Sequence, residues 1–230
     1  MKSEGHNLAT LRQRCMDQKL LFLINGEWTS GGMDRVMALL SSWDVWLPIA
    51  AILIVIFLVR GPFKTRAFIV TVAAVVGIND GVVSNSLKHL IDRPRPHQAL
   101  DGVRVVDLAK ARPRILAIFK PAKVKLSRAS RTPVDGRSCP SSHTINMFSV
   151  ALVSVCFFGR RAAWTFAIAA LVAYSRIYIG AHWPSDIITS IPLGLGSSLL
   201  LLAGFGALWS RCGEAWWPAV HARHPVLFAA

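Results

Sequence analysis

Acidic side chains are scarce in this chain of 230 residues, in which 12 Asp and Glu stand against 26 Lys and Arg, a formal net charge of +14. No cluster of carboxylates has the pattern that holds magnesium, so we expect neither a metal nor a cofactor. The four cysteines form no CxxC pair, and Cys15 and Cys139 could pair only on an oxidising face. The apolar stretch 20–24 is too short for a signal peptide, so none is expected.

Long polar stretches are also few, because 53% of the residues are hydrophobic and the mean hydropathy is +0.45. These values are high for a soluble domain, and several apolar runs approach the length that crosses a bilayer. The length suits one domain, expected over residues 1–230. The basic charges lie between the apolar runs, where anionic lipid head groups are a simpler partner than nucleic acid. We therefore expect a bilayer protein that binds no nucleic acid.

The predicted fold class is all-α, an integral membrane helical bundle. About five transmembrane helices are expected, over residues 45–59, 67–87, 141–158, 162–179 and 185–209. Residues 1–44 carry short apolar patches and interfacial tryptophans, so we expect helices that lie on the membrane or partly enter it. Asn79 and Asp80 interrupt the second run, which predicts a hydrogen bond from this position to a neighbouring helix.

The basic clusters indicate an orientation for these helices. If the five spans alternate, the clusters at 60–66, 160–161 and 211 share one side, which the positive-inside tendency makes cytoplasmic. The opposite, outward side then receives the loop 97–140, with ten Lys or Arg against three Asp. Such a loop is either a solvated run of charge or a rim that attracts an anionic head group.

The stretch 175–186 is a polar interruption between two apolar runs. His182 and Asp186 are four residues apart, so on a helix they share a face and the carboxylate can reach the imidazole. A glycine and a proline in the same stretch predict a turn between two helices. Together with Arg176 this pattern fits either a structural ion pair at a helix start or a catalytic group at the membrane border.

Two further segments fall on the same predicted face. Lys88 and Arg95 are about two helical turns apart and could bind an anion, although a snorkelling basic helix end has the same pattern. Ser141 or Ser142 is a candidate N-cap for the following helix, whose free backbone N–H groups favour an anion. His143 would stand beside that anion, although a plain capping motif also explains these residues.

Together the three segments offer cations, a helix N-terminus, two histidines and a carboxylate, which phosphoryl transfer through a covalent intermediate requires. They resemble, in order, the three signature motifs of the type 2 phosphatidic acid phosphatase family. Lys-x6-Arg-Pro stands at 88–96, Pro-Ser-x-His at 140–143 and Ser-Arg-x5-His-x3-Asp at 175–186. The family includes membrane lipid phosphatases and soluble vanadium haloperoxidases. Ser142 stands where the second motif usually has Gly, but it keeps the backbone N–H.

This resemblance implies a mechanism that needs no metal. His182 would attack phosphorus to give a phosphohistidine, and Asp186 would orient its ring. His143 would protonate the leaving oxygen and then activate water. The groups that would bind the phosphoryl oxygens are Lys88, Arg95, Ser141, Ser142 and Arg176.

For a bacterium, the resemblance implies a lipid phosphatase of the inner membrane, and the alternation of spans places its site on the outward face. Undecaprenyl diphosphate is the favoured substrate because the basic loop suits a diphosphate, while phosphatidylglycerol phosphate and lipid A phosphates are also candidates. Three alternatives remain. A vanadium haloperoxidase would use nearly the same residues, although five spans argue against it, and a phosphotransferase would use the same site. A non-catalytic protein would bind anionic lipid through the basic loop.

Overall fold

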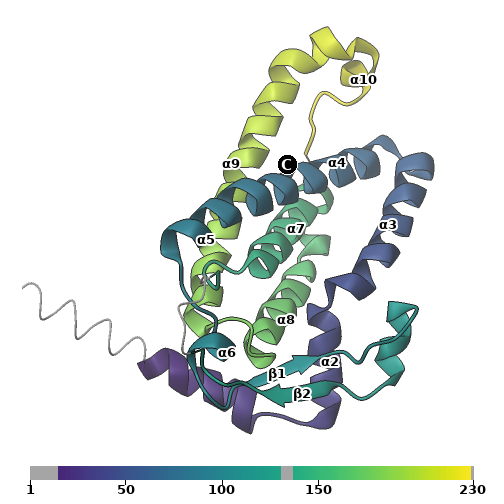
Figure 1. Ribbon diagram of the computed structural model, residues 1–230. Helices are drawn as coiled ribbons and strands as arrows, with labels where there is room; N and C mark the ends of the chain where they lie inside the picture. Colours follow the sequence, from purple (N-terminus) through teal and green to yellow (C-terminus); the bar gives the residue numbers. More distant parts are fainter. Residues whose placement is uncertain (1–14, 131–136, 229–230) are drawn as a thin grey trace, which may run out of the picture. The chain divides into compact units, whose positions relative to one another are not determined.

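The computed structural model describes residues 15–130 and 137–228, and most of them are helical (Figure 1). The chain divides into two compact units, each assembled from three separate segments. The first unit comprises the residues up to Val45, Leu87–Ser141 and Val172–Thr189. The second comprises Trp46–Ser86, Ser142–Leu171 and the residues from Ser190 onward. The expected single domain over 1–230 stays a prediction.

The all-α membrane fold is confirmed. Residues 15–22 are helical, and the named helices are α2 (Gly31–Ser41), α3 (Trp43–Arg60), α4 (Phe63–Ile78), α5 (Asn85–Ile91), α6 (Pro96–Ala99), α7 (Ser142–Phe158), α8 (Thr165–Tyr178), α9 (Pro184–Trp216) and α10 (Pro218–Arg223). Within the described residues, four helical stretches are long and apolar enough to cross a membrane: Trp43–Arg60, Phe63–Ala99, Ser142–Ala162 and Pro184–Trp216. The fifth expected span corresponds to α8, an apolar helix of 14 residues.

Helix α3 shows why these segments suit a bilayer. Its charges are confined to its ends, Asp44 in the first turn and Arg60 in the last, where each complements the helix dipole. Between them the side chains are apolar and outward-facing, with Ile52 61% and Val55 60% exposed. An exposed apolar surface of this length is stable when lipid covers it.

The second unit packs α4, α7 and α9 around an apolar core of Val75, Val153, Phe157 and Leu202. Next to this core, the π-helical segment Asn79–Ser84 begins with the buried Asn79. Its side-chain amide donates to the hydroxyl oxygens of Ser149, at 2.9 Å, and Ser198, at 3.0 Å. The hydrogen bond predicted from Asn79 to a neighbouring helix is therefore confirmed.

One end of the second unit gathers the basic clusters, as the alternation of spans predicts. The Lys64 ammonium lies 5.7 Å from the centre of the Phe158 ring, which directly precedes the cluster at 160–161. The Phe63 ring lies 6.0 Å from that of Trp209, two residues before Arg211. These contacts bring the three basic segments to the same end of their helices.

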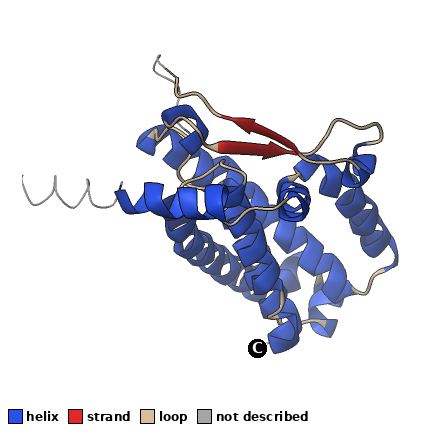
Figure 2. Cartoon of the chain, turned by 90° about the horizontal axis from the view of Figure 1, so that it is seen from below, coloured by secondary structure: helices blue, strands red, loops and turns tan. Residues whose placement is uncertain are grey.

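The first unit contains a two-stranded sheet that the sequence analysis did not predict. Strands β1 (Arg104–Asp107) and β2 (Lys123–Leu126) pair antiparallel, with Arg104 opposite Leu126 (Figure 2). The 3-10 helix Arg114–Phe119 lies between them in the chain. Val106 of β1 and Ala117 of this helix share a buried cluster with Ala38 of α2, so the basic loop has its own apolar core.

The N-terminal residues are bonded into the first unit. The side-chain amide of Asn25 donates to the backbone oxygens of Tyr178, at 2.6 Å, and Arg104, at 2.8 Å, and its oxygen accepts the Arg104 N–H. Asp34 of α2 pairs with the Arg104 guanidinium at 2.8 Å and accepts the Tyr178 hydroxyl at 2.8 Å. The helices expected within 1–44 are thus present in the described part, and their place at the membrane surface stays a prediction.

Candidate active site

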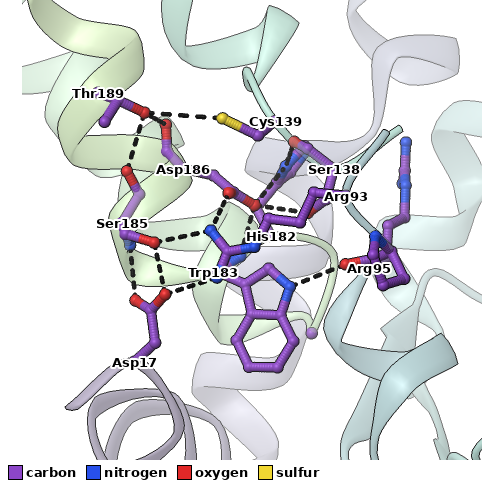
Figure 3. Close-up of polar contacts among 12 residues, drawn as sticks. Asp17, Arg93, Arg95, Ser138, Cys139, His182, Trp183, Ser185, Asp186 and Thr189 are labelled. Carbon is purple, nitrogen blue, oxygen red and sulfur yellow. Dashed lines mark hydrogen bonds and ion pairs between the residues drawn. The ribbon is translucent and has the colours of Figure 1, made fainter. Parts of the chain in front are cut away.

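His182 lies in the turn between α8 and α9 and is 3% exposed. Its Nδ1 lies 2.7 Å from the backbone carbonyl oxygen of Ser138 and 3.7 Å from the Asp186 carboxylate (Figure 3). A carbonyl oxygen can only accept, so Nδ1 carries the hydrogen and Nε2 keeps its lone pair. This tautomer is the one that a histidine nucleophile needs.

The surroundings also keep His182 neutral. Burial is the largest cause that lowers the pKa of its imidazole, from 6.5 to about 4. The Asp186 carboxylate raises this pKa, while the guanidinium charges of Arg176 and Arg95 lower it. At neutral pH the imidazole therefore remains uncharged and able to attack.

Asp186 is fully buried in the first turn of α9 and is held by several donors. Arg93 donates to its Oδ1 at 2.6 Å, and the Ser138 hydroxyl donates to its Oδ2 at 2.5 Å. The backbone N–H of Trp183, three residues earlier, also donates to Oδ2, at 3.0 Å, in the manner of a capping box. The sequence analysis expected Asp186 to hold the imidazole, yet the closest partner of Nδ1 is the Ser138 carbonyl.

Arg93, like Ser138, is a residue that the sequence analysis missed. Its guanidinium bonds Asp186, the Ser185 hydroxyl at 2.8 Å and the Asp17 carboxylate at 2.7 Å (Figure 3). It also lies 5.0 Å from the centre of the Trp183 ring. The Arg-Pro repeat of this segment contains Arg93 as well as the motif's Arg95, and this repetition was the only sequence signal for it.

Two cationic side chains face a cavity of about 190 Å³ in the first unit. Arg95 and Arg176 line it together with Ala181, the neighbour of His182. Arg176 is 8% exposed, and its Nε has no hydrogen-bond partner among the described residues. A buried guanidinium donor without a partner is costly, and an anion that occupies the cavity would satisfy it.

The other predicted phosphate-binding residues lie on helix ends. Lys88 is in the last turn of α5, and Ser141 is buried in the N-cap position of α7. Ser142 and His143 begin α7 and belong to the second unit, where the Ser142 and Ser84 hydroxyl oxygens are 2.6 Å apart. The approach of Ser142 and His143 to the imidazole of His182 therefore stays a prediction.

Within the first unit, the structure thus brings a neutral buried histidine with a fixed tautomer close to two guanidinium groups and a fully bonded carboxylate. This arrangement suits nucleophilic attack on an anionic phosphoryl group. Among the residues that the structure describes, no three His, Cys, Asp or Glu side chains gather to hold a metal ion. All four cysteines, including Cys15 and Cys139, are free thiols.

Comparison with known proteins relates this site to a family. A family model of the PAP2 superfamily matches residues 65–210. The lipid A 4'-phosphatase of Bacteroides thetaiotaomicron is 25% identical over 182 residues, which are 78% of this chain and 72% of that protein. The undecaprenyl-diphosphatase of Sulfolobus acidocaldarius is 28% identical over 176 residues, 73% of this chain and 68% of that protein.

A solved structure has the same fold. The crystal structure of a transmembrane phosphatidylglycerolphosphate phosphatase of PAP2 type from Bacillus subtilis superposes with a TM-score of 0.55. It is 19% identical and the match covers 87% of this chain and 89% of that chain. The family match spans all three motifs of the candidate site. On these grounds the chain belongs to the PAP2 superfamily.

Proposed function

We propose that the protein hydrolyses the phosphate or diphosphate head group of a membrane lipid through a phosphohistidine on His182. Its membership of the family and its relatives make it a membrane lipid phosphatase of the PAP2 type. The observation that carries the mechanism is the bond between Nδ1 of His182 and the Ser138 carbonyl, which leaves Nε2 free to attack.

In the first step, Nε2 of His182 bonds to phosphorus while the bond from phosphorus to the lipid oxygen breaks. His143 gives its proton to that leaving oxygen. In the second step, His143 takes a proton from water, the water oxygen bonds to phosphorus, and the bond from nitrogen to phosphorus breaks. Inorganic phosphate and a restored imidazole are the products.

The chain itself supports the part given to His143. His143 is two positions after Ser141 in the chain, so their Cα atoms are at most about 7 Å apart. Ser141 is buried in the first unit and lies three residues from Ser138, the partner of His182. The phosphoryl oxygens would meet the cations Lys88, Arg95 and Arg176 and the N-terminus of α7, with Ser141 and Ser142.

Undecaprenyl diphosphate is the proposed substrate, ahead of phosphatidylglycerol phosphate and lipid A phosphates. A diphosphate carries more negative charge than a monoester, and exposed basic side chains of the loop would attract it. These side chains include Arg112, Lys120, Lys123, Lys125 and Arg128. One curated relative is an undecaprenyl-diphosphatase, and another acts on lipid A.

The proposed location is a bacterial inner membrane with the site on its outer, periplasmic face. The segments 60–66, 160–161 and 211 meet at one end of the spans, and basic ends of this kind usually remain cytoplasmic. Alternation of the spans then gives the motif segments to the outward end.

The test is phosphate release from the three purified lipids by the full chain in detergent. We expect the highest kcat/KM with undecaprenyl diphosphate and unchanged rates in EDTA. His182→Ala should abolish release, since no other group forms the covalent intermediate, while His89→Ala, an exposed histidine of α5, should retain it. Wild-type rates in His182→Ala, or a strict need for magnesium, would contradict the mechanism.

The same assay separates the alternatives. A phosphotransferase would yield a phosphorylated acceptor in place of free phosphate, and a haloperoxidase would oxidise bromide once vanadate is added. A non-catalytic lipid-binding protein would release no phosphate, and its lipid binding would be lost after Lys123→Glu and Lys125→Glu but kept in His182→Ala.

A further inference from the structure

Asp17 lies in the helical residues 15–22, well before the segment 65–210 that matches the family. We propose that Asp17 is a positioning residue for the histidine–aspartate pair and acts on Asp186 through Arg93 and Ser185. This inference rests on the proposed function, because it concerns the attack by His182. The helical segment 15–22 would then help to position the catalytic residues.

The contacts of Asp17 are extensive for a residue near the chain terminus. The side chain is buried, and its Oδ2 lies 2.7 Å from the Arg93 guanidinium. Its Oδ1 accepts the backbone N–H of Ser185 at 2.9 Å, and its Oδ2 accepts the Ser185 hydroxyl at 2.5 Å. Ser185 directly precedes Asp186 in the first turn of α9, where backbone N–H groups have no partner within the helix. Asp17 therefore caps this turn from a distant part of the chain.

Arg93 connects the two carboxylates. The same guanidinium that bonds Asp17 donates to Asp186 at 2.6 Å, and its side chain is 26% exposed. The three groups carry two negative charges and one positive charge, so their sum is −1. Without the Asp17 charge, Arg93 would neutralise Asp186 and the sum would be zero. Asp17 thus keeps the group of Asp17, Arg93 and Asp186, which approaches Nδ1 of His182, net negative.

This charge is most useful during the chemical step. When Nε2 of His182 bonds to phosphorus, the imidazole ring gains positive charge, which a nearby net negative group stabilises. The substrate's phosphoryl oxygens would contact other residues, so ground-state binding should depend little on Asp17. Loss of the Asp17 charge should therefore lower kcat and leave KM nearly unchanged.

Two variants separate the charge of Asp17 from its hydrogen bonds. Asp17→Asn removes the charge and keeps an oxygen that can accept the Ser185 N–H, whereas Asp17→Ala removes both. The matched control is Asp34→Asn, which weakens a comparable buried ion pair, with Arg104, in the same unit. The full chain in detergent is assayed for kcat and KM of phosphate release and for inhibition by vanadate and by inorganic phosphate.

We expect Asp17→Asn to lower kcat about tenfold, the low end of the effect of removing a group that orients a reacting residue through others, with KM within about twofold of wild type. The inhibition constant of vanadate, which resembles the transition state, should rise in parallel, while that of phosphate stays constant. Asp17→Ala should lose at least as much activity. Asp34→Asn should change turnover only in proportion to the folded fraction. Its inhibition constants for vanadate and phosphate should equal those of wild type, because they do not depend on how many molecules are folded.

Each remaining outcome counts against a stated claim. Wild-type kcat and vanadate inhibition in Asp17→Asn would overturn the positioning role alone. A loss of turnover with an unchanged vanadate inhibition constant would also overturn the positioning role, since Asp17 would then only stabilise the folded protein. No phosphate release from the wild-type chain would overturn the proposed function, and this inference with it.

Discussion

The pH dependence of phosphate release gives a direct test of the environment of His182. The perturbation is a fall in pH from 8 to 3.5, and the group that responds is the buried imidazole. Only its neutral form can attack phosphorus, so the rate should fall as the imidazole gains a proton. An ordinary histidine has a pKa of 6.5, whereas burial lowers that of His182 to about 4.

These two pKa values predict very different rates in mild acid. At pH 5.5 an ordinary histidine would be neutral in only about a tenth of the molecules, whereas His182 should be neutral in nearly all of them. On the acid side of the profile, where His143 keeps the proton that it donates, we therefore expect no loss of kcat/KM down to about pH 5 and a loss of about tenfold per pH unit below pH 4. Two lipids whose phosphates titrate differently provide the control, because a limb at the same pH in both belongs to the enzyme.

The same shift has a consequence for stability, with a definite sign. Between pH 6.5 and 4 the unfolded chain binds a proton on His182 and the folded chain does not, so acid favours unfolding. The effect is absent above about pH 6.5 and amounts to about 3 kcal/mol once the pH reaches 4. Near-ultraviolet circular dichroism of the same samples would follow the folded fraction. A loss of kcat/KM on acidification with its midpoint near pH 6.5, in fully folded protein, would refute the buried neutral imidazole.

Two further predictions follow from single contacts. Arg176→Lys should lower kcat/KM by about 100-fold, because an ammonium cannot replace the unpartnered Nε and the planar fork of the guanidinium. Arg128→Lys, on the exposed loop, serves as the control. Rates of Arg176→Lys within about threefold of wild type would contradict this prediction. Tyr178→Phe removes the hydroxyl that donates to Asp34 and should lower the free energy of unfolding by about 2 kcal/mol. Denaturant titration in detergent measures this loss, kcat per folded molecule should not change, and an unaltered midpoint would count against the bond.

The sequence was sufficient to find the residues whose spacing defines the motifs. Arg176, His182 and Asp186 are brought together in the first unit because short spacings on helices and turns translate directly into proximity. Arg95 is distant in the chain and was found only through the motif that its segment resembles. Ser138 could not be found in this way. It acts on Nδ1 through its backbone carbonyl, which every residue has, and it lies 44 positions from His182 in the chain.

Asp17 and the paired strands were missed for other reasons. Asp17 is 76 residues from Arg93 and 168 from Ser185, and no local pattern connects such distant positions. The strands did leave a signal, since Lys123 to Leu126 alternate basic and apolar side chains with the period of a strand. The high positive charge of the loop suggested a solvated run and hid that alternation.

The structure also gives the loop 97–140 a role beyond the two that its sequence suggested, a solvated charge run and a head-group rim. Its inner side supports the turn that carries His182. Gly180 has a φ of +75°, and a Cβ there would lie 2.6 Å from the backbone oxygen of Arg104 in β1. The Gly180 oxygen in turn lies 3.0 Å from Nδ1 of His97.

This close approach shows how a loop of such charge is held against the turn of His182. The backbone of β1 and the carbonyl of Ser138 fix the nucleophile's turn from two sides, while the lysines of β2 remain exposed. A loop that only attracted lipid would need the charges and not the strands. The same segment holds the imidazole and presents the charges. Insertions within it should therefore lower kcat before they weaken lipid binding.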